Sequence, residues 1–138
     1  MSNRMHTLQK ICKGYNATAL YVFGSRAAEM ILALNDDAYS PTPSASDLDI
    51  GIRVQSDFSL DKKVSFTLEL ETLFNAPRVD LFFFQEVDAF LAANIVRGER
   101  VYAADSYHAD EYELFVLGRA GDLVELERER MAMILHEG

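Results

Sequence analysis

The chain has 138 residues, of which 49% are hydrophobic and 25% are charged. This length and composition predict one packed domain and exclude a long disordered chain. The formal net charge is −9, with 13 basic against 22 acidic residues, which argues against direct binding of nucleic acid or of an anionic membrane. A nucleotide remains compatible with this charge, because metal ions can join its phosphates to carboxylates.

Cysteine usage and hydropathy predict a cytoplasmic location. Cys12 is the only cysteine, so neither an internal disulfide nor a zinc cluster can form. No apolar run reaches the roughly 20 residues that span a bilayer, and the N-terminus lacks the apolar core of a secretion signal. We therefore expect a cytoplasmic protein without membrane contact.

The predicted elements alternate between helices and strands. In chain order they are a helix over 5–15, a strand over 18–23, a helix over 26–34, a loop over 35–46, a strand over 47–54, a helix over 60–74, a strand over 78–84, a helix over 86–96, a short edge strand over 100–103 and a helix over 107–136. Gly118 and Gly121 each cost a helix about 1 kcal/mol relative to alanine, which makes a kink or break there plausible. This order predicts an α/β (α+β) fold with a small mixed sheet flanked by helices. We divide it into a domain over 1–104 and a helical C-terminal extension over 105–138.

Two aspartates share one predicted strand. Because side chains alternate between the faces of a strand, Asp47 and Asp49 point to one side and Leu48 and Ile50 point into the core. Two carboxylates on one face repel each other unless a positive group lies between them, and a divalent cation with oxygen ligands meets that need. Gly51 follows on the same face and should leave space beside the pair. The alternative is that Asp47 and Asp49 lie on a solvated strand edge and bind no metal.

A third aspartate interrupts the apolar strand over 78–84. Asp80 is costly to bury there unless it is paired or bound to a metal. If this strand lies beside that of Asp47 and Asp49, the three carboxylates could hold two Mg²⁺ ions together with substrate phosphates. The alternative is that Asp80 is satisfied by Arg78 or by a backbone amide.

The other half of a phosphate site is a buried strand that ends in Gly24-Ser25 and leads at once into a helix. Backbone N–H groups at a helix start attract anions, and Gly24 lets the backbone approach a phosphate closely. The Ser25 hydroxyl can donate to a phosphate oxygen, and Arg26 adds a fixed positive charge. Taken alone, a Gly-Ser pair after a strand is more often a simple turn, but its combination with aspartates on the next two strands is hard to obtain by accident.

These motifs resemble the nucleotidyltransferase fold of the DNA polymerase beta superfamily, and more closely its minimal nucleotidyltransferase (MNT) group. The resemblance covers about residues 5–104 and rests on Gly24-Ser25, Asp47, Asp49 and Asp80. It implies that the Gly-Ser pair binds the triphosphate, that the aspartates ligate the metal, and that Asp80 helps to activate the attacking hydroxyl. The implied reaction is Mg²⁺-dependent transfer of AMP from ATP to an acceptor hydroxyl, with release of pyrophosphate.

Two features depart from the family pattern. Gly24 and Asp47 lie 23 positions apart (47 − 24), whereas family members usually have them closer together. The excess lies in 30–45, which we interpret as extra helix plus a polar loop that either covers the nucleotide, contacts an acceptor or is inert. In addition, many members carry a glycine soon after the serine, where this chain has Ala27-Ala28-Glu29.

The resemblance also suggests a partner. Antibiotic-modifying relatives carry a substantial second domain, for which 105–138 is too short. Small stand-alone members are often encoded beside a HEPN-type ribonuclease toxin and act as its antitoxin, by AMPylation of a toxin tyrosine or by complex formation. We therefore expect an antitoxin of a toxin–antitoxin system. Two alternatives stay open: a catalytically silent antitoxin that acts by binding alone, and a small-molecule nucleotidyltransferase that acts as a homo-oligomer.

The C-terminal segment carries two groups of apolar side chains that bear on the partner. They are Tyr107, Tyr112, Leu114, Phe115 and Leu117, followed by Leu123, Leu126, Met133 and Ile134. They either contact a partner or pack on the chain's own domain.

Overall fold

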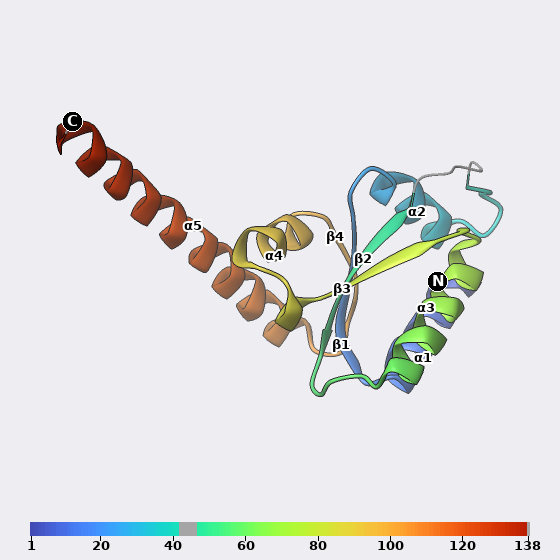
Figure 1. Cartoon of the computed structure of the whole chain (residues 1–138). Coiled ribbons are helices and arrows are strands. Elements are labelled where there is room, and N and C mark those ends of the chain that lie inside the picture. Colours follow the sequence, from blue (N-terminus) through green and yellow to red (C-terminus); the bar gives the residue numbers. More distant parts are fainter. Residues whose placement is uncertain (42–46, 138) are drawn as a thin grey trace.

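The computed structural model describes residues 1–41 and 47–137 and arranges them around one sheet (Figure 1). The elements are α1 (Asn3–Gly14), β1 (Ala17–Phe23), α2 (Ala27–Asn35), β2 (Leu48–Val54), α3 (Leu60–Phe74), β3 (Val79–Phe83), the 3₁₀ turn η1 (Phe84–Glu86), α4 (Ala89–Val96), β4 (Glu99–Ala103) and α5 (Ser106–Glu137). The sheet has the strand order β3-β2-β1-β4. β1 is antiparallel to both β2 and β4, whereas β2 and β3 are parallel. The predicted small mixed sheet is confirmed, and β4 is an edge strand as expected.

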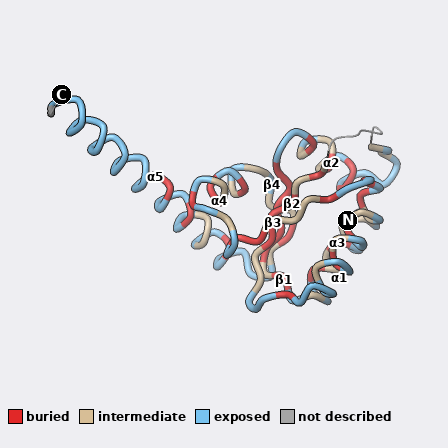
Figure 2. The backbone as a smooth tube through the Cα atoms, in the orientation of Figure 1, coloured by how far each residue is buried: buried red, intermediate tan, exposed pale blue. Residues whose placement is uncertain are grey.

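Helices cover both faces of this sheet, which gives the domain two apolar cores (Figure 2). The first core joins α1, α2 and α3 to side chains that include Leu20, Val22, Leu48, Ile50 and Ile52. The second joins α4 and the first half of α5 to side chains that include Ala19, Tyr21 and Phe23. The alternation along β1 and β2 therefore follows the predicted period of two.

The start of α4 differs from the sequence prediction. We expected a helix over 86–96, but α4 begins at Ala89 and a separate 3₁₀ turn ends at Glu86. The cause is a side-chain cap, because the Asp88 carboxylate accepts a hydrogen bond from the Leu91 N–H at 2.8 Å. An aspartate in this position satisfies an N–H group that the first helical turn leaves without a partner.

The long helix α5 is continuous through Gly118 and Gly121, so it has no break at the two glycines. Its first half is attached to the sheet by buried Ala109, Val116 and Ala120. Every residue from 121 to 136 is exposed, and this second half projects away from the domain (Figures 1 and 2). Of the first apolar group only Tyr112 packs on the domain, whereas Tyr107, Leu114, Phe115 and Leu117 are exposed. Contact of the exposed residues with a partner stays a prediction.

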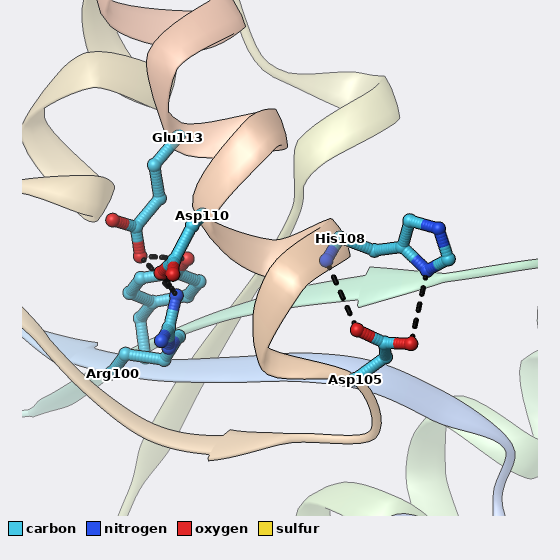
Figure 3. Close-up of polar contacts among 6 residues, drawn as sticks. Arg100, Asp105, His108, Asp110 and Glu113 are labelled. Atoms are coloured by element: carbon cyan, nitrogen blue, oxygen red, sulfur yellow. Dashed lines mark hydrogen bonds and ion pairs between the residues drawn. The ribbon is translucent and has the colours of Figure 1, made fainter.

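A polar cluster also fastens α5 to the sheet (Figure 3). Glu113 accepts hydrogen bonds from the Tyr21 hydroxyl at 2.6 Å and from the Arg100 guanidinium at 3.0 Å. Arg100 also contacts Asp110 at 2.9 Å. Burial, followed by the contact with Glu113, raises the pKa of Tyr21 well above its usual value, so the phenol remains a donor.

Of the described part of the predicted 30–45 insertion, Met30, Ile31 and Leu34 belong to the first core. The first residues of the insertion complete α2, and the following turn binds the start of α1, where the backbone N–H groups of Asn3 and Arg4 donate to Asp37 at 2.7 and 3.1 Å. The Arg4 guanidinium also donates to the Tyr39 carbonyl at 2.8 Å. The helical part of the prediction is confirmed, and residues 42–46 lie outside the described residues. Among the helices of the described chain, none is both long and apolar enough to cross a membrane.

Candidate active site

The predicted site residues gather at one end of the sheet, because three strands reach it together. β2 and β3 run parallel in a register that places Asp49 directly beside Asp80. β1 runs antiparallel to β2 and pairs Phe23 with Asp49, so the chain enters the Gly24-Ser25 turn at the same place. Two of the carboxylates and the Gly-Ser turn therefore meet on the face of the sheet that α4 covers further along.

Gly24 lies so close to Asp49 that a side chain at this position would force Asp49 to move. Its φ of +79° lies in the region that side chains disfavour, and a Cβ atom added there would lie 2.4 Å from Oδ2 of Asp49. The glycine therefore satisfies both a turn conformation and a close approach. This contact joins the candidate phosphate-binding turn to the candidate metal ligand.

The electrostatics of Asp49 indicate a site that favours a cation. Burial raises the pKa of Asp49, and the negative charges of Asp80 and then Asp47 raise it further. The ionised form, which a metal ion needs, is therefore the costly form in the absence of a cation. A positive charge placed among these carboxylates would relieve both the desolvation and the repulsion.

Arg78 supplies part of that charge in the structure. Its Nε atom lies 3.3 Å from Oδ1 of Asp80 and 3.6 Å from Oδ2 of Asp47. The expected alternative partner of Asp80 is thus confirmed. The guanidinium side chain is 69% exposed, so water screens these ion pairs and each is worth little on its own.

The carboxylates fit Mg²⁺ as partial ligands and not as a complete cage. In the described ranges, no three Asp, Glu, His or Cys side chains are placed so that they could hold one metal ion. Mg²⁺ normally uses one or two carboxylates and fills its other positions with water and substrate phosphates. Asp49 and Asp80, side by side on neighbouring strands, have the donor chemistry for this arrangement, and Asp47 could join them if Arg78 moved away. That all three ligate metal stays a prediction.

An open cleft of about 570 Å³ lies beside the Gly-Ser turn. Gly24 and Ser25 line it together with Asn94 and Arg97. Sequence reasoning missed these last two residues. Gly98 was the feature of the sequence that could have indicated them, because a glycine allows two backbones to approach closely. In the structure a Cβ atom at Gly98 would lie 2.5 Å from the Val22 carbonyl oxygen, and this close approach brings the end of α4 against the end of β1.

The Arg26 side chain is buried in the structure. It is only 5% exposed, and its Nε lies 3.6 Å from Oε2 of Glu29. The negative charge of Glu29, in the first turn of α2, is thereby balanced by the residue that directly precedes the helix. A direct contact between Arg26 and a phosphate stays a prediction, as does the binding of phosphate by Gly24 and Ser25.

The expectation for Gly51 was wrong. We expected this glycine to leave space beside the aspartates, but a Cβ atom there would lie 2.3 Å from Cγ2 of Ile95. The space is filled by α4, and the glycine serves helix–sheet packing.

The strand register, the Gly-Ser turn and the carboxylates together define a nucleotidyltransferase type of domain. The sequence model of the family "Polymerase beta, Nucleotidyltransferase" matches residues 6–107, and the chain belongs to this family. A comparison with curated proteins gave no match.

Solved structures share the fold over nearly the whole chain. A toxin–antitoxin complex with AMP-PNP contains a chain with a TM-score of 0.62 and 18% identity, with 96% of each chain covered. The complex of a tri-AMPylated Shewanella oneidensis HEPN toxin with its MNT antitoxin gives a TM-score of 0.57 and 17% identity, with 95% of this chain and 92% of the other covered. The toxin–antitoxin complex MntA-HepT gives 0.58 and 16%, with coverage of 95% and 93%.

Proposed function

We propose that this protein is a Mg²⁺-dependent protein adenylyltransferase that transfers AMP from ATP to a hydroxyl of a HEPN-type toxin, and that it acts as the antitoxin in the cytoplasm. The observation that carries the proposal is the register that sets Asp49 beside Asp80 and against Gly24. The fold shared with chains of toxin–antitoxin complexes, one of them with AMP-PNP and one with an AMPylated toxin, supports the donor and the partner.

Separate residues would bind the triphosphate of the donor and the metal ions. The N–H groups at the Gly24-Ser25 turn and the Ser25 hydroxyl would donate to the triphosphate, and Arg97, which lines the same cleft, would be an additional cation. Asp47, Asp49 and Asp80 would hold up to two Mg²⁺ ions, which would stabilise the charge on the attacking and leaving oxygens. Arg26 would add positive charge behind the turn.

The transfer itself needs one proton acceptor. The acceptor hydroxyl oxygen forms a bond to the α-phosphorus while the bond from that phosphorus to the bridging oxygen breaks, and pyrophosphate leaves. Asp80 would take the hydroxyl proton, since it stands next to Asp49 at the same level of the sheet. Its side chain is 32% exposed, so an acceptor from another protein can approach it.

Transfer of labelled AMP tests the proposal. The chain is incubated with α-labelled ATP, Mg²⁺ and a HEPN-type toxin whose ribonuclease residues have been substituted. Label should appear on the toxin, and Asp47→Ala combined with Asp49→Ala should abolish it. Absence of label on the toxin, with full neutralisation by the double variant, would establish the binding-only alternative. Label on an added aminoglycoside but not on the toxin would establish the small-molecule alternative.

A further inference from the structure

The projecting half of α5 carries an apolar surface that its own domain does not cover. Seven large apolar side chains on it are exposed, namely Leu123, Val124, Leu126, Met131, Met133, Ile134 and Leu135. Soluble proteins rarely expose large contiguous apolar patches without a binding role. These side chains surround the helix, but Val124, Met131 and Leu135 lie within about 40° of one another on one side. That side is the candidate interaction surface.

Part of this surface forms a groove with α4. The groove has a volume of about 460 Å³ and is lined by Phe90, Val124, Glu127, Arg128, Met131, Ala132 and Leu135. Phe90 is 53% exposed and Leu135 is 75% exposed. The lining residues of α5 all lie beyond Ala120, the last buried residue of that helix, so the groove continues the contact between α4 and α5 into solvent. Figure 2 shows this change from buried to exposed along α5.

The charge around the groove decides between its candidate occupants. Residues 121–137 contain five acidic side chains and two basic ones, and both arginines are paired within the helix. Arg128 contacts Glu125 at 3.0 Å, and Arg130 contacts Glu127 at 2.7 Å. A second copy of the chain would bring the same acidic excess and would be repelled, whereas a basic partner would be attracted.

We propose that this groove, the α4–α5 groove, binds an amphipathic helix of the partner whose apolar ridge is flanked by lysine or arginine. The proposal rests on the proposed function, in which the partner is a ribonuclease toxin. A protein that handles RNA presents basic side chains to phosphate, and the acidic second half of α5 extends about 25 Å at 1.5 Å per residue. It is long enough to lie along such a helix and compete with RNA for its basic residues.

Binding measurements with groove variants test the proposal. The full chain is titrated by calorimetry against the toxin with its ribonuclease residues substituted. Met131→Glu combined with Leu135→Glu should weaken binding at least roughly tenfold, as loss of a central apolar anchor does. Binding by the wild type should also weaken as NaCl is raised.

Leu126→Glu combined with Met133→Glu is the matched control, because it adds the same two charges outside the groove lining. Met133 is 62% exposed, and it lies on the opposite side of α5 because residues two positions apart are about 200° apart around a helix. The affinity of the control variant for the toxin should stay within roughly threefold of that of the wild type. Circular dichroism of each variant checks that α5 remains helical.

The outcomes separate the groove from the active site. Unchanged toxin binding by the Met131→Glu, Leu135→Glu variant would overturn the inference, and labelled AMP on the toxin would leave the proposed function standing. Loss of binding by that variant, with no AMP transfer by the wild type, would support the groove and contradict the catalytic proposal. A wild-type dimer that the groove variant dissociates would identify a second copy as the occupant and overturn the inference.

Discussion

Replacing Gly24 with alanine should separate the effect on activity from the effect on stability. The added methyl group lies 2.4 Å from Oδ2 of Asp49, whereas real Cβ atoms essentially never come under 3.0 Å, and φ is +79°. Alanine in the left-handed region costs about 1–2 kcal/mol. Asp49 must move by an appreciable fraction of an ångström, and a misplacement of about 1 Å can cost a reaction about 100-fold.

We therefore expect the Gly24→Ala variant to fold but to transfer AMP about 100-fold more slowly. Its free energy of unfolding should fall by about 1–2 kcal/mol, which for a domain of this size lowers Tm by roughly 3–8 °C. Thermal unfolding followed by circular dichroism gives the stability, and single-turnover transfer of labelled AMP gives the rate. If no transfer is measurable in the wild type, the affinity for Mg²⁺ provides the readout.

Gly118→Ala is the control for this experiment. Beyond the neighbouring backbone of its own helix, a Cβ atom at Gly118 would meet no atom of the described chain within 4 Å, and alanine favours a helix over glycine by about 1 kcal/mol. This variant should be more stable and equally active. A Gly24→Ala variant with wild-type activity and metal affinity would refute the reasoning, because Asp49 would not need the position that the glycine allows.

Three further variants test the electrostatics of the site and the attachment of α5. Because the folded protein raises the pKa of Asp49, stability from this group is present at low pH and is lost as pH rises through the folded-state pKa. Asp49→Asn should therefore raise Tm at pH 7, with a gain that shrinks toward acid pH, although activity is lost; a lower Tm at pH 7 would contradict this. Arg78→Gln should tighten Mg²⁺ binding in a calorimetric titration, because the guanidinium no longer competes for Asp47 and Asp80, and should cost at most about 1 kcal/mol of metal-free stability. Weaker Mg²⁺ binding would mean that Arg78 positions the carboxylates instead. Glu113→Ala should lower the free energy of unfolding by about 1–3 kcal/mol, because it leaves the Tyr21 hydroxyl without this acceptor. In urea denaturation, Glu113→Ala should lower the free energy of unfolding by less in a Tyr21→Phe background than in the wild type. Equal losses in the two backgrounds would show that Glu113 and Tyr21 are not coupled.

The sequence contained the local signals of the fold, and these were predictable. The helix over 60–74 was predicted with the bounds that the structure gives. It begins after Ser59, whose side chain accepts from the Lys62 N–H, and it ends at Asn75 in the left-handed conformation. Such caps depend on a few neighbouring residues, so sequence reasoning can find them.

Contacts between distant segments were harder to predict. The sequence predicted that three aspartates could meet, because they lie on predicted strands. The pairing of Asp49 with Asp80, however, depends on the register between the two strands. The error at Gly51 has the same cause, since the face of a strand is predictable and the helix that fills the space is not. Arg97 was missed because it reaches the cleft only through the packing of Gly98 on β1.

The short helix α4 borders both candidate binding surfaces. Asn94 near its C-terminal end lines the cleft beside the Gly-Ser turn, and Phe90 near its start lines the α4–α5 groove. It spans eight residues, Ala89–Val96, so a shift of the whole helix would reach both surfaces. Thermodynamic linkage then sets a condition on any shift of α4: if a bound partner changes the affinity for nucleotide by some factor, bound nucleotide changes the affinity for the partner by the same factor.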